Sequence, residues 1–192
     1  TFPDVPLTNA YHDAIEGMAA KKIISGYTTG YFGPGDPVVR QQFAKMIVLT
    51  KGLTPTLSDK YDFTDSASIA DPEGELYPYH FVARAALSGL VKGYADGSFK
   101  PLNNISRQQV ITMVVRAGST VLVPPPFGYK GVLDYSDPAH GENIRVAEYN
   151  GLLDGIMGSA SGLVGWSTTG NAARGECAQV LWNLLQKLDP AG

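Results

Sequence analysis

The chain has 192 residues, of which 44 % are hydrophobic, 10 % aromatic and 17 % charged, and its formal net charge is −3. This much apolar and aromatic content excludes intrinsic disorder, and an acidic chain without a run of Lys or Arg is unsuited to nucleic acid. No stretch reaches the roughly 18 apolar residues of a membrane helix, so we expect no membrane insertion. We expect any export signal to have been removed or to lie outside this sequence.

Three similar units follow one another along the chain. The segments 26–32 (GYTTGYF) and 93–99 (GYADGSF) match at a shift of 67 residues, and the same shift relates Arg40, Arg107 and Arg174. Each unit also opens with an aromatic residue and an aspartate two positions later, at Phe2 and Asp4, Phe63 and Asp65, and Tyr135 and Asp137. We place the repeats at residues 1–54, 62–118 and 134–189 and expect them to form one compact domain together.

Apolar residues at helical spacing predict two short helices in each unit. In the first unit one stripe runs from Ile15 to Ile23 and stops before Gly26, and a second helix begins near Val39. The corresponding stripes cover residues 82–90 and 110–117, then 144–152 and 177–184. A helix pair of this length cannot bury its own apolar faces. We therefore expect an all-α fold in which three helix-loop-helix repeats pack with pseudo-threefold symmetry around a central three-helix bundle.

The sequence offers no chemistry for catalysis or for metal binding. Its single cysteine, Cys177, excludes an intramolecular disulfide, and the three histidines are scattered. Cys177 lies in an apolar helical stripe, which predicts a buried, inert thiol. No Ser-His-Asp arrangement, phosphate loop or placed pair of carboxylates is present. We expect a protein that is not an enzyme and that has neither a cofactor nor a metal.

The order of these motifs resembles the S-layer homology family over nearly the whole chain. The family pattern is aromatic-x-Asp, a helix, Gly-Tyr-x-Asp-Gly-x-Phe-x-Pro, and then Ile-Thr-Arg-Ala-Glu at the start of a second helix. The second unit is the most similar, at 93–101 and 105–109, and the third keeps mainly Gly155, Trp166, Arg174 and Glu176. The resemblance implies a helical spindle with grooves between its repeats. It also implies an extracellular, cell-surface location and binding of a secondary cell-wall polysaccharide, often a pyruvylated one.

An arginine lies in the first turn of the second helix of every unit. The N-terminus of a helix already carries a partial positive charge, so an arginine beside free N–H groups costs stability and favours an anion. The alternative is that each arginine pairs with a loop aspartate, for instance Asp4, Asp65, Asp96 or Asp137. The candidate glycan-binding residues are Arg40, Arg107, Arg174, Gly26, Tyr27, Gly30, Gly93, Tyr94, Asp96, Gly97, Gln42 and Gln109.

The three grooves are expected to differ in charge. Gln42 and Gln109 replace the glutamate of the family motif, which keeps the reach of a capping residue and removes a charge that repels anions. Glu176 retains that charge, so we expect the third groove to bind most weakly. Ser106 with Gln109 predicts a capping box. On this basis the loss of Arg107 is expected to weaken binding most, the loss of Arg40 less and that of Arg174 least.

The loop residues also have purely structural interpretations. Gly26 and Gly93 are candidate helix C-caps, and Gly30 and Gly97 are candidate turn residues with positive φ. A glycine also lets a sugar approach the backbone, and a tyrosine supplies a flat face with a hydroxyl. We interpret Phe32, Phe99 and Trp166 as core residues and Asp4, Asp65 and Asp137 as turn or N-cap residues.

The sequence thus predicts a module that binds an anionic, pyruvylated wall polysaccharide and tethers a surface or surface-layer protein to the bacterial envelope. The alternative is a structural module that assembles a surface lattice through contacts between copies of its parent protein, without its own glycan binding.

Overall fold

A computed structural model describes residues 2–72, 74–157 and 162–190. Within these residues the secondary structure is helical, without a strand, which confirms the predicted all-α class. The helices are α1 (His12–Ala20), α2 (Arg40–Thr50), the 3₁₀ turn η1 (Ser66–Ile69), α3 (Tyr79–Leu87), α4 (Arg107–Ala117), α5 (Gly141–Tyr149) and α6 (Arg174–Leu188).

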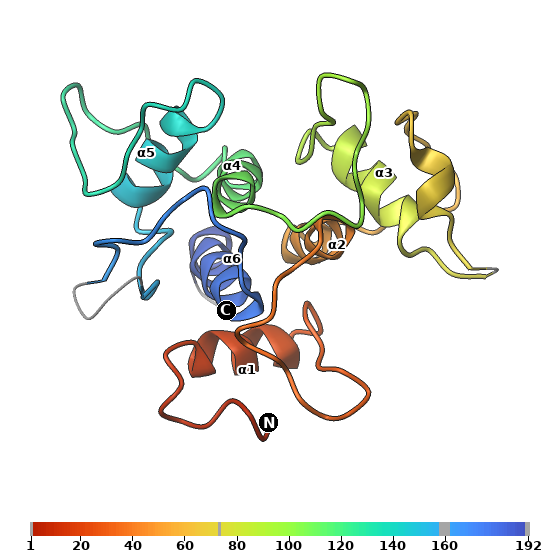
Figure 1. Cartoon of the computed structure of the whole chain (residues 1–192), viewed down its shortest axis with the longest axis horizontal. Coiled ribbons are helices and arrows are strands. Elements are labelled where there is room, and N and C mark those ends of the chain that lie inside the picture. Colours follow the sequence, from red (N-terminus) through yellow and green to blue (C-terminus); the bar gives the residue numbers. More distant parts are fainter. Residues whose placement is uncertain (1, 73, 158–161, 191–192) are drawn as a thin grey trace.

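The second helices of the three repeats form the centre of the molecule. Figure 1 shows α2, α4 and α6 nearly end-on in the middle, with α1, α3 and α5 around them. The three central helices contact one another in every pair, which confirms the expected bundle. Just before these helices the backbone closes a ring around the pseudo-threefold axis. Val38 N–H donates to the carbonyl of Ala172, Ala172 N–H to that of Ile105, and Ile105 N–H to that of Val38, over 2.8–3.1 Å.

Each outer helix packs on the central helix of another repeat. Helix α3 packs on α2, α5 packs on α4, and α1 packs on α6, so the first and last helices of the chain close the circle. The last contact is tight, because a Cβ atom on Gly17 of α1 would lie 2.5 Å from the ring of Trp182 on α6. The repeat seen in the sequence is therefore not the unit of helix packing.

One continuous apolar core runs through the molecule. Phe32 and Phe99 are each 1 % exposed and Trp166 is 6 % exposed, which confirms their interpretation as core residues. Cys177 is fully buried, and burial raises the pKa of its thiol well above the usual value. This environment confirms the expectation of an inert thiol.

Candidate functional site

The first-turn N–H groups of the central helices are already hydrogen-bonded. At α2, Arg40 N–H donates to the carbonyl of Asn103 and Gln41 N–H to that of Pro101, both at 3.0 Å. The equivalent donors of α4 and α6 bond to carbonyls of the next repeat around the ring in the same way; they are Arg107, Gln108, Arg174 and Gly175. The expectation that these N–H groups are free to receive a carboxylate is therefore wrong, because loop carbonyls occupy them.

The residue at the third helical position caps each central helix. Gln109 accepts a hydrogen bond from Ser106 N–H at 3.1 Å, and the hydroxyl of Ser106 accepts one from Gln109 N–H at 3.4 Å. This is the predicted capping box. Gln42 and Glu176 likewise accept from the backbone N–H three residues before them, at 3.1 and 3.0 Å.

Arg40 reaches into the loop of the second repeat. Its Nε donates to the carbonyl of Phe99 at 2.7 Å and its Nη2 to that of Lys92 at 3.4 Å. The guanidinium carbon lies 4.7 Å from the ring centroids of both Tyr94 and Phe99. The loop 93–99 of the second repeat therefore contacts Arg40 of the first repeat.

Arg174 makes the same set of contacts to the loop of the first repeat. Its Nε donates to the carbonyl of Phe32 at 2.7 Å and its Nη2 to that of Ser25 at 2.8 Å. Its guanidinium carbon lies 4.7 Å from the ring centroid of Tyr27 and 4.4 Å from that of Phe32. In the ion pairs recorded among the described residues, no carboxylate is paired with Arg40 or Arg174.

Arg107 differs from the other two because it is paired with an acid. Its Nε and Nη2 donate to the two carboxylate oxygens of Glu176 at 3.0 and 2.7 Å, and its Nη1 donates to the carbonyl of Ser167 at 3.0 Å. The indole N–H of Trp166 donates to the same carboxylate at 2.8 Å. The alternative of a paired arginine is thus correct here, although the partner is Glu176 and not one of the loop aspartates.

A cleft of about 260 Å³ opens beside Arg40. We call it the first cleft, and residues from all three repeats line it: Arg40, Lys92, Gly93, Tyr94, Gln109, Thr112, Met113, Arg116, Ala139 and His140. Arg40 itself is only 5 % exposed, and burial lowers the pKa of its guanidinium. No aspartate or glutamate is among the lining residues.

The equivalent cleft beside Arg174 has a volume of about 170 Å³. We call it the second cleft, and it is lined by Ile23, Ile24, Ser25, Phe32, Gln42, Lys45, Met46, Tyr77 and Arg174, again from all three repeats. Two of the predicted residues, Gln42 and Arg174, therefore lie together here.

A small cavity lies beside the third arginine, Arg107. The cavity beside Arg107 and Glu176 has a volume of only about 10 Å³. Asn183 of α6, at the position equivalent to Arg116, donates from its Nδ2 to the carbonyls of Leu152 and Asp154 at 3.0 and 2.8 Å. Of the three spaces described beside the arginines, this one is the smallest.

The loop positions require glycine either because the backbone has a positive φ or because a neighbouring side chain approaches closely. Gly30 and Gly97 have φ values of 86° and 76°, as predicted for turn residues. Gly26 has no positive φ and α1 already ends at Ala20, so the interpretation of Gly26 as a helix C-cap is wrong. The same holds for Gly93, because α3 ends at Leu87. A Cβ atom at Gly26 would lie 2.6 Å from the ring of Phe2, which is a close approach that excludes a side chain.

Two of the predicted residues support the loops and do not line the clefts. Asp96 accepts hydrogen bonds from the hydroxyl and the N–H of Ser98 at 2.6 and 3.0 Å and pairs with Lys100, and these contacts lower its pKa to about 2. Tyr27 lies under Arg174 and donates its hydroxyl proton to Asp36 at 2.9 Å. Both side chains shape the loop that carries them.

The aspartates that open the repeats hold the same loops from outside. Asp4 accepts from the N–H groups of Phe32 and Gly33 at 2.8 and 2.7 Å, and Asp65 does so at the equivalent loop. Burial alone would raise the pKa of Asp4, but these hydrogen bonds and the charge of Arg174 lower it. Asp4 and Asp65 therefore stabilise loops that are distant in the sequence. Asp137, by contrast, caps the nearby N–H groups of residues 139 and 140 as expected.

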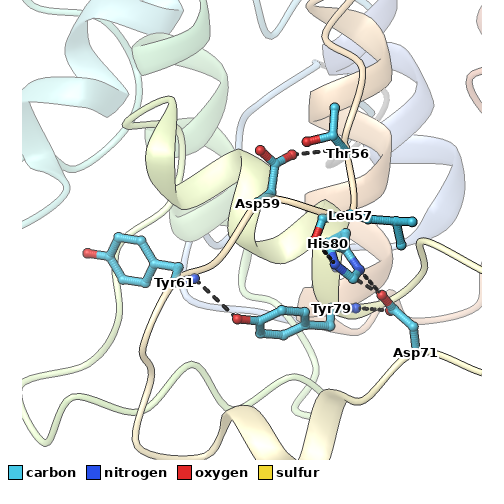
Figure 2. Close-up of polar contacts among 7 residues, drawn as sticks. All are labelled: Thr56, Leu57, Asp59, Tyr61, Asp71, Tyr79 and His80. Carbon is cyan, nitrogen blue, oxygen red and sulfur yellow. Dashed lines mark hydrogen bonds and ion pairs between the residues drawn. The ribbon is translucent and has the colours of Figure 1, made fainter.

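The segment between α2 and α3 brings Tyr77 to the second cleft. Figure 2 shows how it is held, with the carboxylate of Asp71 accepting from the N–H groups of Tyr79 and His80 and lying against His80 Nδ1. His80 Nε2 lies 3.2 Å from the carbonyl of Leu57 (Figure 2). Asp71 thus caps the first turn of α3, directly after Tyr77.

Sequence reasoning missed several residues that line the clefts. These are Lys45, Tyr77, Lys92, Thr112, Arg116, Ala139 and His140, together with the apolar residues around them. None of them belongs to the repeated motif, and His140 and Tyr77 come from the repeat after the one that supplies the loop. A comparison of equivalent helix positions would have found one signal, because Arg116 of α4 replaces Leu49 of α2.

Comparison with known proteins agrees with this geometry. The S-layer homology domain matches the chain at residues 1–44 and 62–111. The chain belongs to the S-layer homology family. The third repeat lies outside the matched segments, but α5 and α6 complete the same threefold arrangement. Membership of this family makes the chain a cell-surface anchoring module that is associated with the cell wall.

The relatives of this S-layer homology module are much longer proteins. It is 31 % identical over 117 residues to the S-layer protein sap of Bacillus anthracis, which is 61 % of this chain and 13 % of that protein. It is 32 % identical over 111 residues to a surface layer protein of Brevibacillus choshinensis, which is 56 % of this chain and 9 % of that protein. An endoglucanase of Bacillus sp. (strain KSM-635) is 34 % identical over 117 residues, which is 60 % of this chain and 11 % of the endoglucanase. The module thus spans about a tenth of these relatives.

Two further observations concern the described part of the module. It contains no helix that is both long and apolar enough to cross a membrane. It also contains no group of three or more His, Cys, Asp or Glu side chains placed to hold a metal ion.

Proposed function

We propose that this module anchors its parent protein to the bacterial cell wall by binding an acidic polysaccharide, such as a pyruvylated one, in the first and second clefts. The observation that carries the proposal is the pair of arginines, Arg40 and Arg174. Each lies in an open cleft and is held by loop carbonyls and aromatic rings, and neither has a recorded carboxylate partner in the described residues.

The energetics of a buried cation favour an anionic ligand. Removing a guanidinium from water is costly unless an opposite charge compensates it, and Arg40 is almost fully buried. Carbonyl oxygens supply part of that compensation, and a carboxylate in the cleft would supply the rest. Because the arginine is already fixed, binding costs little side-chain entropy.

The walls of the clefts suit a sugar. Tyr94 contributes an aromatic surface to the first cleft, and Gln109 and Thr112 contribute polar groups beside it. Gly93 is exposed, so a sugar ring can approach the backbone there. A pyruvate ketal combines a carboxylate with a sugar ring, which matches an arginine next to such a wall.

The relatives support an accessory role over catalysis. A surface layer protein and an endoglucanase share similar fractions of their length with this chain, although their names describe different activities. We propose that the common segment holds each protein at the wall while other parts of the chain differ.

Lattice assembly without glycan binding is the second candidate function. Large apolar side chains lie on the surface, among them Leu7 at 86 %, Leu102 at 67 % and Phe127 at 107 % relative exposure. They belong to different loops of the chain. A monomeric module that binds purified wall polymer would favour the first candidate, and one that only self-associates would favour the second.

The deciding experiment compares charge-neutral variants in sedimentation with purified wall polysaccharide. The double variant Arg40→Gln, Arg174→Gln should sediment less with the polymer. Its affinity for the polymer should be at least about tenfold lower than that of the unchanged protein. The matched control is Lys60→Gln with Lys130→Gln, which removes the same charge from exposed positions outside both clefts. An equal loss in both double variants would show that only net charge matters and would contradict the proposal.

A further inference from the structure

We propose that the two clefts recognise different units of the polymer. The first cleft takes a sugar unit that carries two negative charges, and the second takes a unit with one negative charge and an apolar face. This inference rests on the proposed function, because it assigns a ligand class to each of the two clefts.

The clefts can be compared residue by residue. Helices α2 and α4 have the same length and are related by the shift of 67, as are the loops that end at Phe32 and Phe99. The first cleft carries Lys92 and Arg116 where the equivalent residues on the other side are Ser25 and Leu49. Two positions thus change from uncharged to cationic, and one changes in the opposite direction, because Thr112 of the first cleft corresponds to Lys45 of the second. The first cleft therefore has one more cation than the second.

The first cleft gathers positive charge without an acidic neighbour in its lining. Arg40, Lys92 and Arg116 contribute three cations, and His140 adds a group that can be charged. None of the ion pairs recorded in the described part of the chain involves Arg40, Lys92 or Arg116. Burial lowers the pKa of both Arg40 and Arg116, because a guanidinium that is removed from water holds its charge less favourably. A dianion relieves this cost more fully than a monoanion does.

The second cleft has fewer free cations and a more apolar wall. The ammonium of Lys45 lies 5.0 and 5.6 Å from the ring centroids of Tyr77 and Phe81, so two aromatic faces already hold it. Arg174 remains as the arginine at the loop, and Ile23 and Met46 line the cleft beside it. One carboxylate next to a methyl group, as in a pyruvate ketal, matches this arrangement.

Chemical-shift titration of the ¹⁵N-labelled protein tests the assignment, because amides in the two clefts report separately. The dianionic probes are N-acetylglucosamine 6-phosphate and digalacturonic acid, which distinguish a phosphate from two carboxylates. The monoanionic probe is a methyl galactoside with a 4,6-pyruvate ketal. At pH 7.5 at least one dianion should bind the first cleft about tenfold more tightly than the ketal does, whereas the ketal should prefer the second cleft.

Variants that copy one cleft into the other sharpen the test. Lys92→Ser with Arg116→Leu gives the first cleft the residues found at Ser25 and Leu49, which this fold already accepts. Dianion binding there should fall at least about tenfold while ketal binding at the second cleft stays unchanged. The charge-preserving Arg116→Lys should retain most of the affinity, and Lys130→Ser serves as the surface control.

The outcomes separate this inference from the proposed function. Equal preference of both clefts for every probe, or a double variant with unaltered dianion affinity, overturns the inference and leaves anionic glycan binding in place. If none of the three probes binds in either cleft, and wall polymer binds elsewhere on the protein, both the proposed function and the inference are overturned.

Discussion

Arg107 and Glu176 form a two-pronged ion pair between helices α4 and α6, 69 residues apart in the sequence. The other two central helices have a glutamine at the position equivalent to Glu176, namely Gln42 in α2 and Gln109 in α4. The single change from glutamine to glutamate thus supplies the third arginine with an internal anion. The ion pair leaves Arg107 with little net charge to offer an anionic ligand.

Replacing this acid should cost stability and expose a cation. Glu176 is 6 % exposed, so Glu176→Gln leaves Arg107 without its anion and should lower the free energy of unfolding by about 1–3 kcal/mol. Urea denaturation measures the change. Glu142→Gln is the control, because it removes a surface pair with Arg145 that should contribute little. Equal stability of the two variants would contradict a structural role for the Arg107 pair.

The arginines should rank by the cleft they line. Arg40→Gln and Arg174→Gln should each weaken wall binding about tenfold or more, whereas Arg107→Gln should mainly lower thermal stability. This order replaces the expectation from sequence that Arg107 matters most. Titration calorimetry with wall polymer measures it, and circular dichroism verifies folding. A folded Arg107→Gln protein that no longer binds would refute this ranking.

Binding by an arginine and a carboxylate should weaken with salt. The Debye length falls from about 10 Å at 0.1 M to about 3 Å at 1 M ionic strength, which screens the cations at the mouth of the first cleft. We expect affinity for wall polymer to fall steadily between these limits. Affinity that is independent of salt would point to contacts with neutral sugar groups instead.

His140 should make stability depend on mildly acidic pH. Burial and, to a lesser degree, Arg116 lower the pKa of its imidazole, while Asp137 opposes them. A histidine with a lowered pKa binds fewer protons in the folded state than in the unfolded state, so stability falls as pH drops below the unfolded value of about 6.5. His140→Asn should reduce the loss of Tm between pH 7.5 and 5, and an unchanged loss would exclude this residue as the cause.

Asp71 should matter for one cleft only. It caps α3 beside Tyr77, so Asp71→Ala should lower stability by about 1–2 kcal/mol and weaken ligand binding in the second cleft. The first cleft, which has no residue from this segment, should keep its affinity. The exposed Asp62→Ala is the matched control, and titration followed by NMR distinguishes the two clefts.

The predictable part of this protein is the part that is encoded locally. The helices, the Ser106–Gln109 cap and the burial of Cys177 follow from spacing within a few residues. The partner of each arginine could not be predicted in this way. A shift of 67 residues shows that the repeats are equivalent, but it does not show which repeat each arginine contacts. The cations at Lys92 and Arg116 were missed for a related reason. They lie where the repeats differ, and only the packed structure shows that they line the same cleft as Arg40.

The closure of the circle by α1 and α6 has a consequence for how the chain folds as it is synthesised. Helix α1 is the first helix of the module to be made, yet the helix that covers it, α6, is the last of the module. Gly17 therefore meets Trp182 only when nearly all of the module is present. Helices α3 and α5, by contrast, find their partners immediately upstream. The apolar side of α1, with Ile15 and Met18, must therefore wait in contact with solvent or with a chaperone. Truncation of α6 would accordingly destabilise α1, at the opposite end of the module.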